Sequence, residues 1–230
     1  MTRSEALTLR EFEPRDRDAV IAMHREPRVR QWLVDDVPLD DARSAHEFIV
    51  RIQAYYRTHP GLGIWCAERW SAVLSPAALA DPQVRAALSD EALERLARPQ
   101  PRFVGWFNLM RVTDWPDEVE IGCRLRPEAW GSGLVHDGGE RLLDRAFGAL
   151  GLPRVWGICH PQHRSVQHVL RSLGFGADGE RACAGVTASC FVITADRWAQ
   201  VRETPRRQRI RECLRTACTD PRGRSVIGPS

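Results

Sequence analysis

The chain has 230 residues and no lysine, so its 33 basic side chains are all arginine; with 30 acidic side chains, its formal net charge is +3. This near balance does not favour a nucleic-acid partner, and no apolar run approaches the roughly 20 residues of a membrane-spanning helix. The chain begins without the apolar segment of a secretory signal. Its seven cysteines are widely spaced, and Cys213 and Cys218 lack the spacing of a zinc pair. These features predict a cytoplasmic protein with reduced thiols and no metal.

The first elements are predicted from alternation and helical spacing. A strand is expected over residues 7–12, and Pro14 and Asp16 begin a short helix after it. A second helix is expected over residues 42–56, with Asp40 or Asp41 as its N-cap. Further strands are expected at residues 64–68, 103–112 and 191–194.

Residues 71–101 separate two of these strands and read as a helical insertion. Helix starts are indicated at Ser75-Pro76, Asp81-Pro82 and Ser89. Either a decoration of the fold or a functional lid would account for such a segment. Beyond about residue 201 arginine dominates, and we expect residues 201–230 to be a frayed basic helix or a disordered, solvated tail that follows a domain over residues 1–200.

The segment from residue 118 to 147 predicts a strand, a tight glycine turn and a helix. The strand is indicated by apolar residues that alternate with polar residues or glycine: Val119, Ile121, Cys123 and Leu125. Gly131 and Gly133 form the turn, and apolar residues then recur at helical spacing: Leu142, Leu143, Ala146, Phe147 and Leu150. Backbone N–H groups at such a helix start suit an anionic phosphate, although many strand-to-helix connections use a similar turn.

A second strand and helix follow over residues 151–175. Together the two segments resemble the GNAT N-acetyltransferase superfamily, in the branch of the ribosomal-protein N-terminal acetyltransferases. The loop Trp130–Val135 is similar to the family's acetyl-CoA loop, Arg/Gln-x-x-Gly-x-Gly/Ala, and its closing segment is matched by Val169, Leu170, Leu173, Gly174 and Phe175. The opening residues 7–33 also look like this branch, so the resemblance covers about residues 7–199.

The resemblance implies a mixed α/β (α+β) fold, with a twisted, largely antiparallel sheet that splays in the middle and helices on both faces. The splay is expected between the strand that carries Glu120 and the strand at residues 154–159. Acetyl-CoA is the implied co-substrate. Its implied binding residues are Cys123, Arg124, Leu125, Trp130, Gly131, Ser132, Gly133, Leu134, Val135 and His163.

The chain departs from the family pattern at several positions. Val135 stands where the family has Gly or Ala, and His136 replaces a small residue. His163 and Val166 replace the Asn and Ser associated with CoA and catalysis. The helix after the loop also contains two glycines, Gly138 and Gly139, each of which costs roughly 1 kcal/mol relative to alanine.

Glu120 is the candidate general base. It lies on the polar face of its strand with Gly122, which would leave room for the pantetheine chain to approach the backbone. The alternative is a surface carboxylate of the same kind as Glu118. The resemblance implies that backbone N–H groups near Gly122–Leu125 stabilise the oxyanion.

The general acid is left open between Ser165 and His168, and His163 lies beside them. A helix cap is the alternative for Ser165, and an ordinary surface position is the alternative for both histidines. The family often uses a tyrosine, but the only two tyrosines, Tyr55 and Tyr56, lie far upstream.

The acceptor is expected to be an amine held by Asp35 and Asp36, with an ordinary acidic loop as the alternative. A peptide α-amine with a pKa near 7.8 is roughly a quarter neutral at cellular pH, whereas a lysine near 10.4 is only about 0.1% neutral, so a protein N-terminus is favoured. We expect an N-acetyltransferase, monomeric or homodimeric. Two alternatives stay open: a degenerate GNAT domain that binds CoA or a protein partner, and a small-molecule acetyltransferase for antibiotics or polyamines.

Overall fold

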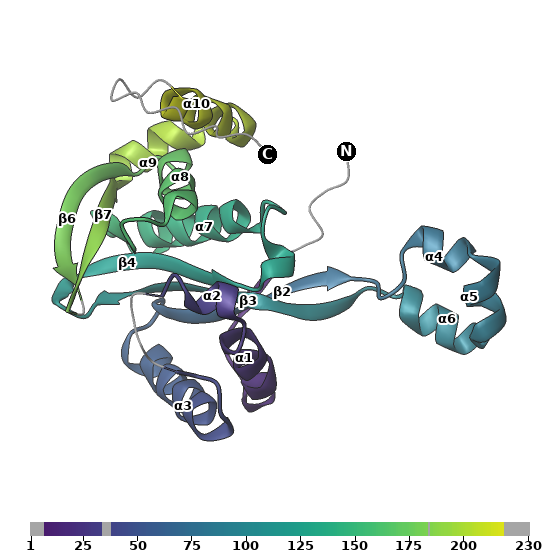
Figure 1. Cartoon of the computed structure of the whole chain (residues 1–230). Helices are drawn as coiled ribbons and strands as arrows, with labels where there is room; N and C mark the ends of the chain where they lie inside the picture. The colour runs from purple at the N-terminus through teal and green to yellow at the C-terminus, as the bar shows by residue number, and fades with distance from the viewer. Residues whose placement is uncertain (1–6, 34–37, 184, 219–230) are drawn as a thin grey trace. The chain divides into compact units, whose positions relative to one another are not determined.

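The structure is a computed structural model that describes residues 7–33, 38–183 and 185–218 (Figure 1). Within these residues seven strands form one sheet, in the order β1-β2-β3-β4-β5-β7-β6. The strands are β1 Leu7–Arg10, β2 Gly63–Ser71, β3 Gln100–Val112, β4 Trp115–Leu125, β5 Arg154–Cys159, β6 Gly176–Cys183 and β7 Val186–Thr194. The pairs β1–β2, β2–β3, β5–β7 and β6–β7 are antiparallel, and β4 and β5 are parallel.

The helices are α1 Arg17–His24, α2 Pro27–Arg30, α3 Ala42–Thr58, α4 Pro76–Ala80, α5 Pro82–Ala87, α6 Asp90–Ala97, α7 Leu134–Asp144, α8 Arg164–Ser172, α9 Ala195–Arg202 and α10 Arg206–Cys218. Two short 3₁₀ turns, η1 Pro14–Asp16 and η2 Pro127–Ala129, and a π-helical turn, η3 Arg145–Ala149, complete the elements. The expected mixed α/β class with a largely antiparallel sheet is confirmed.

The chain divides into two compact units. Unit 1 holds the described parts of Met1–Gln31, Asp36–Met110 and Gly122–Gly138. Unit 2 holds the described parts of Trp32–Asp35, Arg111–Ile121 and Gly139–Ser230. Strand β4 and helix α7 therefore each contribute residues to both units.

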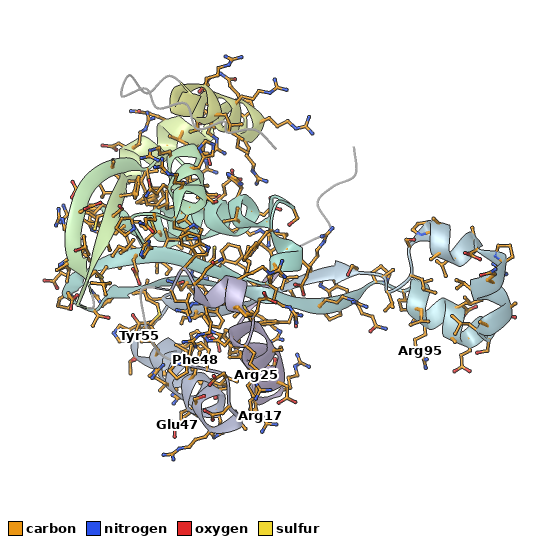
Figure 2. The ribbon with its side chains drawn as sticks, viewed as in Figure 1. Arg17, Arg25, Glu47, Phe48, Tyr55 and Arg95 are labelled. Atoms are coloured by element: carbon orange, nitrogen blue, oxygen red, sulfur yellow. The ribbon has the colours of Figure 1, made fainter. Side chains whose placement is uncertain are left out.

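The core of unit 1 is built on aromatic residues from α3, from β3 and from the loop that follows β1. Phe48 of α3 stacks on Trp106 of β3 with ring centroids 5.2 Å apart, and Phe12 meets both rings edge-on. Asp41 begins α3 by accepting the N–H groups of Arg43 and Ser44, as expected, because a carboxylate there satisfies donors that have no intrahelical partner. Figure 2 shows Phe48 on the side of α3 directed toward the sheet and Glu47 projecting outward.

The insertion in unit 1 is a set of three short helices at the end of the β2–β3 hairpin (Figure 1). The predicted starts are confirmed: the side chains of Ser75, Asp81 and Ser89 each accept a backbone N–H of the first turn. The β2–β3 ladder extends to Ser71 and Gln100, and Leu96 closes the insertion by accepting two backbone N–H groups. Figure 2 shows Arg95 projecting from α6.

In unit 2 the last helix is anchored by one buried arginine. Arg209 of α10 is 8% exposed. It donates to Glu140 of α7 at 2.5 Å and to the carbonyls of Ser172 and Thr204 at 3.0 and 3.1 Å. Residues 206–218 thus form the expected basic helix. The expectation of a solvated tail is wrong for the face of α10 that carries Arg209, because this buried side chain ties α10 to α7, which lies far earlier in the chain.

Candidate active site

The turn before α7 has an open backbone. Gly131 and Gly133 adopt φ of +70° and +84°, a left-handed conformation that residues with a Cβ rarely take. A Cβ built at either position would meet no atom within 4 Å. Trp130 donates its indole N–H to the carbonyl of Leu125 at 2.8 Å, and Ser132 donates its hydroxyl to the carbonyl of Ala129 at 2.5 Å. These bonds hold the turn in place while its glycines leave the space beside it clear.

Helix α7 begins directly after this turn, at Leu134. The first N–H groups of any α-helix have no intrahelical acceptor and lie at the positive end of its dipole. Leu134 is buried, whereas Val135 and His136 are half-buried. The turn and the helix start together form a site suited to a phosphate.

The two glycines inside α7 are explained by close packing. A Cβ on Gly138 would lie 2.2 Å from the ring of Phe107 in unit 1, and one on Gly139 would lie 2.9 Å from Leu173 in unit 2. The lost helix propensity is therefore the cost of a close approach, which sequence periodicity alone does not reveal.

The strand face that holds Gly122 differs from expectation. A Cβ on Gly122 would lie 2.7 Å from the side-chain oxygen of Asn108, so a β3 side chain occupies the space that we assigned to pantetheine. Asn108 is a polar residue beside the candidate site that the sequence analysis missed. Its only signal was a lone polar residue within the apolar run of β3.

The other cofactor candidates on β4 are held within unit 1. The guanidinium of Arg124 lies 3.2 Å from His24 and stacks 5.1 Å from the centre of the Trp106 ring. Burial raises the pKa of the Cys123 thiol to about 12, so this thiol stays protonated at neutral pH. Leu125 is buried.

Glu120 is half-buried in the part of β4 that belongs to unit 2. The parallel ladder between β4 and β5 pairs Glu120 with Trp156 and Ile121 with Gly157, and β4 continues for four residues beyond it, to Leu125. This short ladder agrees with the predicted splay. Burial, followed by the charge of Glu120, raises the pKa of the Cys183 thiol at the end of β6.

The start of α8 carries an aromatic stack that the sequence did not predict. His163, the N-cap residue of α8, lies flat on Trp32 with ring centroids 4.5 Å apart and 21° between the planes. His160 meets the same indole edge-on at 6.1 Å. Burial, followed by the charge of His160, lowers the pKa of His163, so this imidazole favours its neutral form.

The two candidates for the general acid sit differently on α8. Ser165 is exposed and lies inside the helix, so it is not the helix cap. His168 is half-buried, and its Nε2 atom is buried with no hydrogen-bond partner in the described structure. Tyr56 is occupied elsewhere, donating its hydroxyl to the carbonyl of Ile64 and accepting the N–H of Phe12 at 3.2 Å.

Comparison with known proteins decides the family. The sequence model of the acetyltransferase (GNAT) domain matches residues 6–176, about three quarters of the chain. The chain belongs to the GNAT acetyltransferase family.

Solved structures share this GNAT fold at low identity. An acetyltransferase from Agrobacterium tumefaciens is 18% identical with a TM-score of 0.59, over 84% of this chain and 92% of that one. The ribosomal-protein-S5-alanine acetyltransferase from Vibrio fischeri is 14% identical with a TM-score of 0.58, over 86% and 97%. The spermidine/spermine N-acetyltransferase from Vibrio cholerae is 14% identical with a TM-score of 0.56, over 88% and 100%.

GNAT domains normally use acetyl-CoA, and the turn at Gly131 and Gly133 suits a pyrophosphate because its backbone is open and leads into a helix start. The acceptor candidates Asp35 and Asp36 lie outside the described residues. Asp41, by contrast, is engaged as the cap of α3.

One group of metal-ligand type occurs among the described residues of the GNAT domain: Asp16, Cys66 and Glu68. The guanidinium of Arg10 already bridges its two carboxylates, at 2.7 Å from Asp16 and 2.5 Å from Glu68. No helix in the described part of the chain has the length and apolar character to cross a membrane.

Proposed function

We propose that this GNAT domain is an acetyl-CoA-dependent N-acetyltransferase that acts on an amine by direct attack in a ternary complex. The observation that carries the proposal is the open turn at Gly131 and Gly133, which leads into the start of α7. Acetyl-CoA, when bound, supplies the acetyl group as a thioester. The backbone N–H groups from Gly131 to Val135 would hold its pyrophosphate.

Glu120 is the proposed general base. A carboxylate within hydrogen-bond reach of the acceptor amine takes up the proton that the amine loses as it attacks. Backbone N–H groups of Cys123, Arg124 and Leu125 would donate to the developing oxyanion.

His168 is the preferred proton donor to the leaving thiolate, ahead of Ser165. The Nε2 atom of His168 is buried and has no hydrogen-bond partner in the described structure. A buried polar atom of this kind requires an explanation, and a catalytic role is one. The stack on Trp32 supports a role for His163 in fixing the start of α8.

The acceptor is an amine, for which a protein N-terminus is proposed because less deprotonation is needed than for lysine. Two structural neighbours named above act on a ribosomal-protein alanine and on spermidine or spermine, so both a protein N-terminus and a small polyamine are represented within the same fold. A cytoplasmic location suits the free thiols of Cys66, Cys123, Cys159, Cys183, Cys190 and Cys213.

A degenerate GNAT domain that binds CoA or a partner without turnover is the second candidate. It is favoured by Val135 at the start of α7 and by the replacement of the family's Asn and Ser by His163 and Val166. Thiol release from acetyl-CoA separates the two candidates. We expect steady release with at least one member of a panel of N-terminal peptides, polyamines and amino sugars. Flat traces throughout, with acetyl-CoA still bound in calorimetry, would support the degenerate domain and contradict the enzyme.

A further inference from the structure

Unit 2 contains a hollow of about 410 Å³ on the sheet formed by β4, β5, β7 and β6. Its walls include the indoles of Trp115 and Trp156, whose ring centroids lie 5.4 Å apart in an edge-on arrangement. Arg181 of β6 lies over both rings, 5.2 Å from the first and 4.9 Å from the second, and Arg154 lies 5.9 Å from the second. We call this hollow the tryptophan–arginine pocket.

The carboxylates of the pocket are already engaged. The two carboxylate oxygens of Glu118 share the single N–H of the Arg154 Nε, at 2.9 and 3.0 Å. Glu118 also accepts from the Nη2 of Arg154 and from the indole N–H of Trp156 at 2.8 Å. These bonds from Arg154 hold the pKa of Glu118 below its usual range. Asp178 accepts from Arg181 Nη2. A polycationic ligand would therefore have to displace arginines that are already in place.

The arginines, by contrast, retain donors. A guanidinium carries five N–H groups in one plane, and stacking on an indole leaves that plane free at its edge. Within the described chain, the recorded bonds involve Nε and Nη2 of Arg154 and Nη2 of Arg181. The Nη1 group of Arg154 and the Nε and Nη1 groups of Arg181 are left to bind an anion. Both side chains are accessible, at 49% and 46% exposure.

The pocket adjoins the candidate base. Trp156 is the register partner of Glu120 on the neighbouring strand, and partners in a ladder project to the same face. Glu118 and Glu120 are two residues apart on β4, so their side chains share that face at a spacing of roughly 6–7 Å. An acceptor that reaches from Glu120 to the arginines of the pocket needs an amine at the Glu120 end and an anionic group at the arginine end.

We infer that the tryptophan–arginine pocket binds an anionic group of the acceptor, which makes the preferred acceptor an amine that carries a carboxylate or other anion roughly 6–8 Å away. The inference rests on the proposed function, which places the acceptor amine at Glu120. It selects against spermidine-like acceptors. A peptide N-terminus followed by an acidic side chain and a small ω-amino acid both have this chemistry.

Binding tests the inference without turnover. The eight tryptophans give separate indole N–H signals after ¹⁵N-tryptophan labelling of the full chain, and Trp156→Phe assigns the pocket signal. The probes are two matched pairs: Ser-Glu-Ala-amide with Ser-Gln-Ala-amide, and 6-aminohexanoate with its amide. We expect the anionic member of at least one pair to bind about tenfold or more tightly, as one charge-assisted contact allows. Which pair responds identifies the source, peptide or small molecule.

Three variants make the test specific. Arg181→Gln and Arg154→Gln should each reduce the ratio of affinities within the pair toward one. Arg197→Gln removes the same charge from an exposed position on α9 and should leave the ratio unchanged. Equal binding within both pairs in the wild-type chain, or a ratio that persists in both pocket variants, would overturn the inference.

Thiol release with the same probes separates this inference from the proposed function. Turnover of both members of a pair at equal kcat/KM, together with equal binding, would leave the acetyltransferase standing and overturn the anion pocket. Anion-selective binding without any turnover would keep the pocket and contradict the enzyme.

Discussion

The imidazole of His163 lies on the indole of Trp32, although 131 positions separate them in the sequence. The stack places a residue of the α8 start against a residue from the segment that follows α2. His163 stands where the family has Asn. The side chain of asparagine has no aromatic ring, so it could not form this stack on Trp32.

The first prediction concerns the pH dependence of stability. The pKa of His163 is lowered in the folded chain, so the unfolded chain binds more protons as pH falls below about 6.5. Stability linked to His163 is therefore present above that pH and lost below it, down to the folded pKa. We expect the melting temperature of His163→Gln to decline less steeply than that of the wild-type chain between pH 7 and 5. Parallel curves would show that the stack does not couple to titration.

The second prediction concerns the cofactor turn. Gly133→Asp adds a side chain at φ +84° and a negative charge at the proposed pyrophosphate position, so we expect acetyl-CoA affinity to fall tenfold or more in calorimetry. Gly151→Asp is the matched control, because Gly151 also has a positive φ, of +59°, and open space at its Cβ, but lies outside the turn. Equal loss in both variants would point to a general folding defect. Val135→Ala should bind as well as the wild-type chain or better.

The third prediction concerns Glu120. Glu120→Gln keeps the shape of the side chain but cannot accept the proton, so kcat should fall by about 10²–10⁴-fold while acetyl-CoA affinity holds. The loss should shrink at high pH, where more of the acceptor amine is neutral. Glu203→Gln, an exposed carboxylate, is the control. Full activity in the Glu120→Gln variant would remove this carboxylate from the mechanism.

The fourth prediction concerns the glycines of α7. Alanine is the better helix former by about 1 kcal/mol, but at Gly138 its Cβ would overlap the fully buried ring of Phe107. Overpacking of this kind costs about 1–3 kcal/mol, so Gly138→Ala should lower the urea midpoint. Gly148→Ala meets no atom within 4 Å and should be neutral or stabilising. A stabilised Gly138→Ala would mean that the helix and β3 separate more easily than this packing implies.

The fifth prediction concerns the α10 anchor. Arg209→Met keeps most of the apolar stem but leaves Glu140 and two carbonyls without this donor, so the free energy of unfolding should fall by about 3 kcal/mol. Arg207→Met, at an exposed position of the same helix, should change it by less than about 0.5 kcal/mol. Denaturant titration of both variants provides the comparison, and similar midpoints would contradict the anchoring role.

Features that depend on neighbouring residues could be predicted from the sequence. The caps at Ser75, Asp81 and Ser89 are local, because a side-chain oxygen bonds an N–H group two or three positions later. The turn at Gly131 and Gly133 and the closing Leu173-Gly174-Phe175 are equally local, and they were sufficient to indicate the family that the comparison then established.

Tertiary structure decided the features that depend on distant partners. The same residue type, glycine, is a turn former at Gly133 and a packing site at Gly138, and only the position of Phe107 distinguishes them. Likewise, Arg207 and Arg209 look alike in a basic tail, but one is exposed and the other is buried against Glu140. Periodicity reports which face of an element is apolar, whereas close contacts arise from side chains that the fold brings together across many positions, and these determined the partners of Gly122, His163 and Arg209.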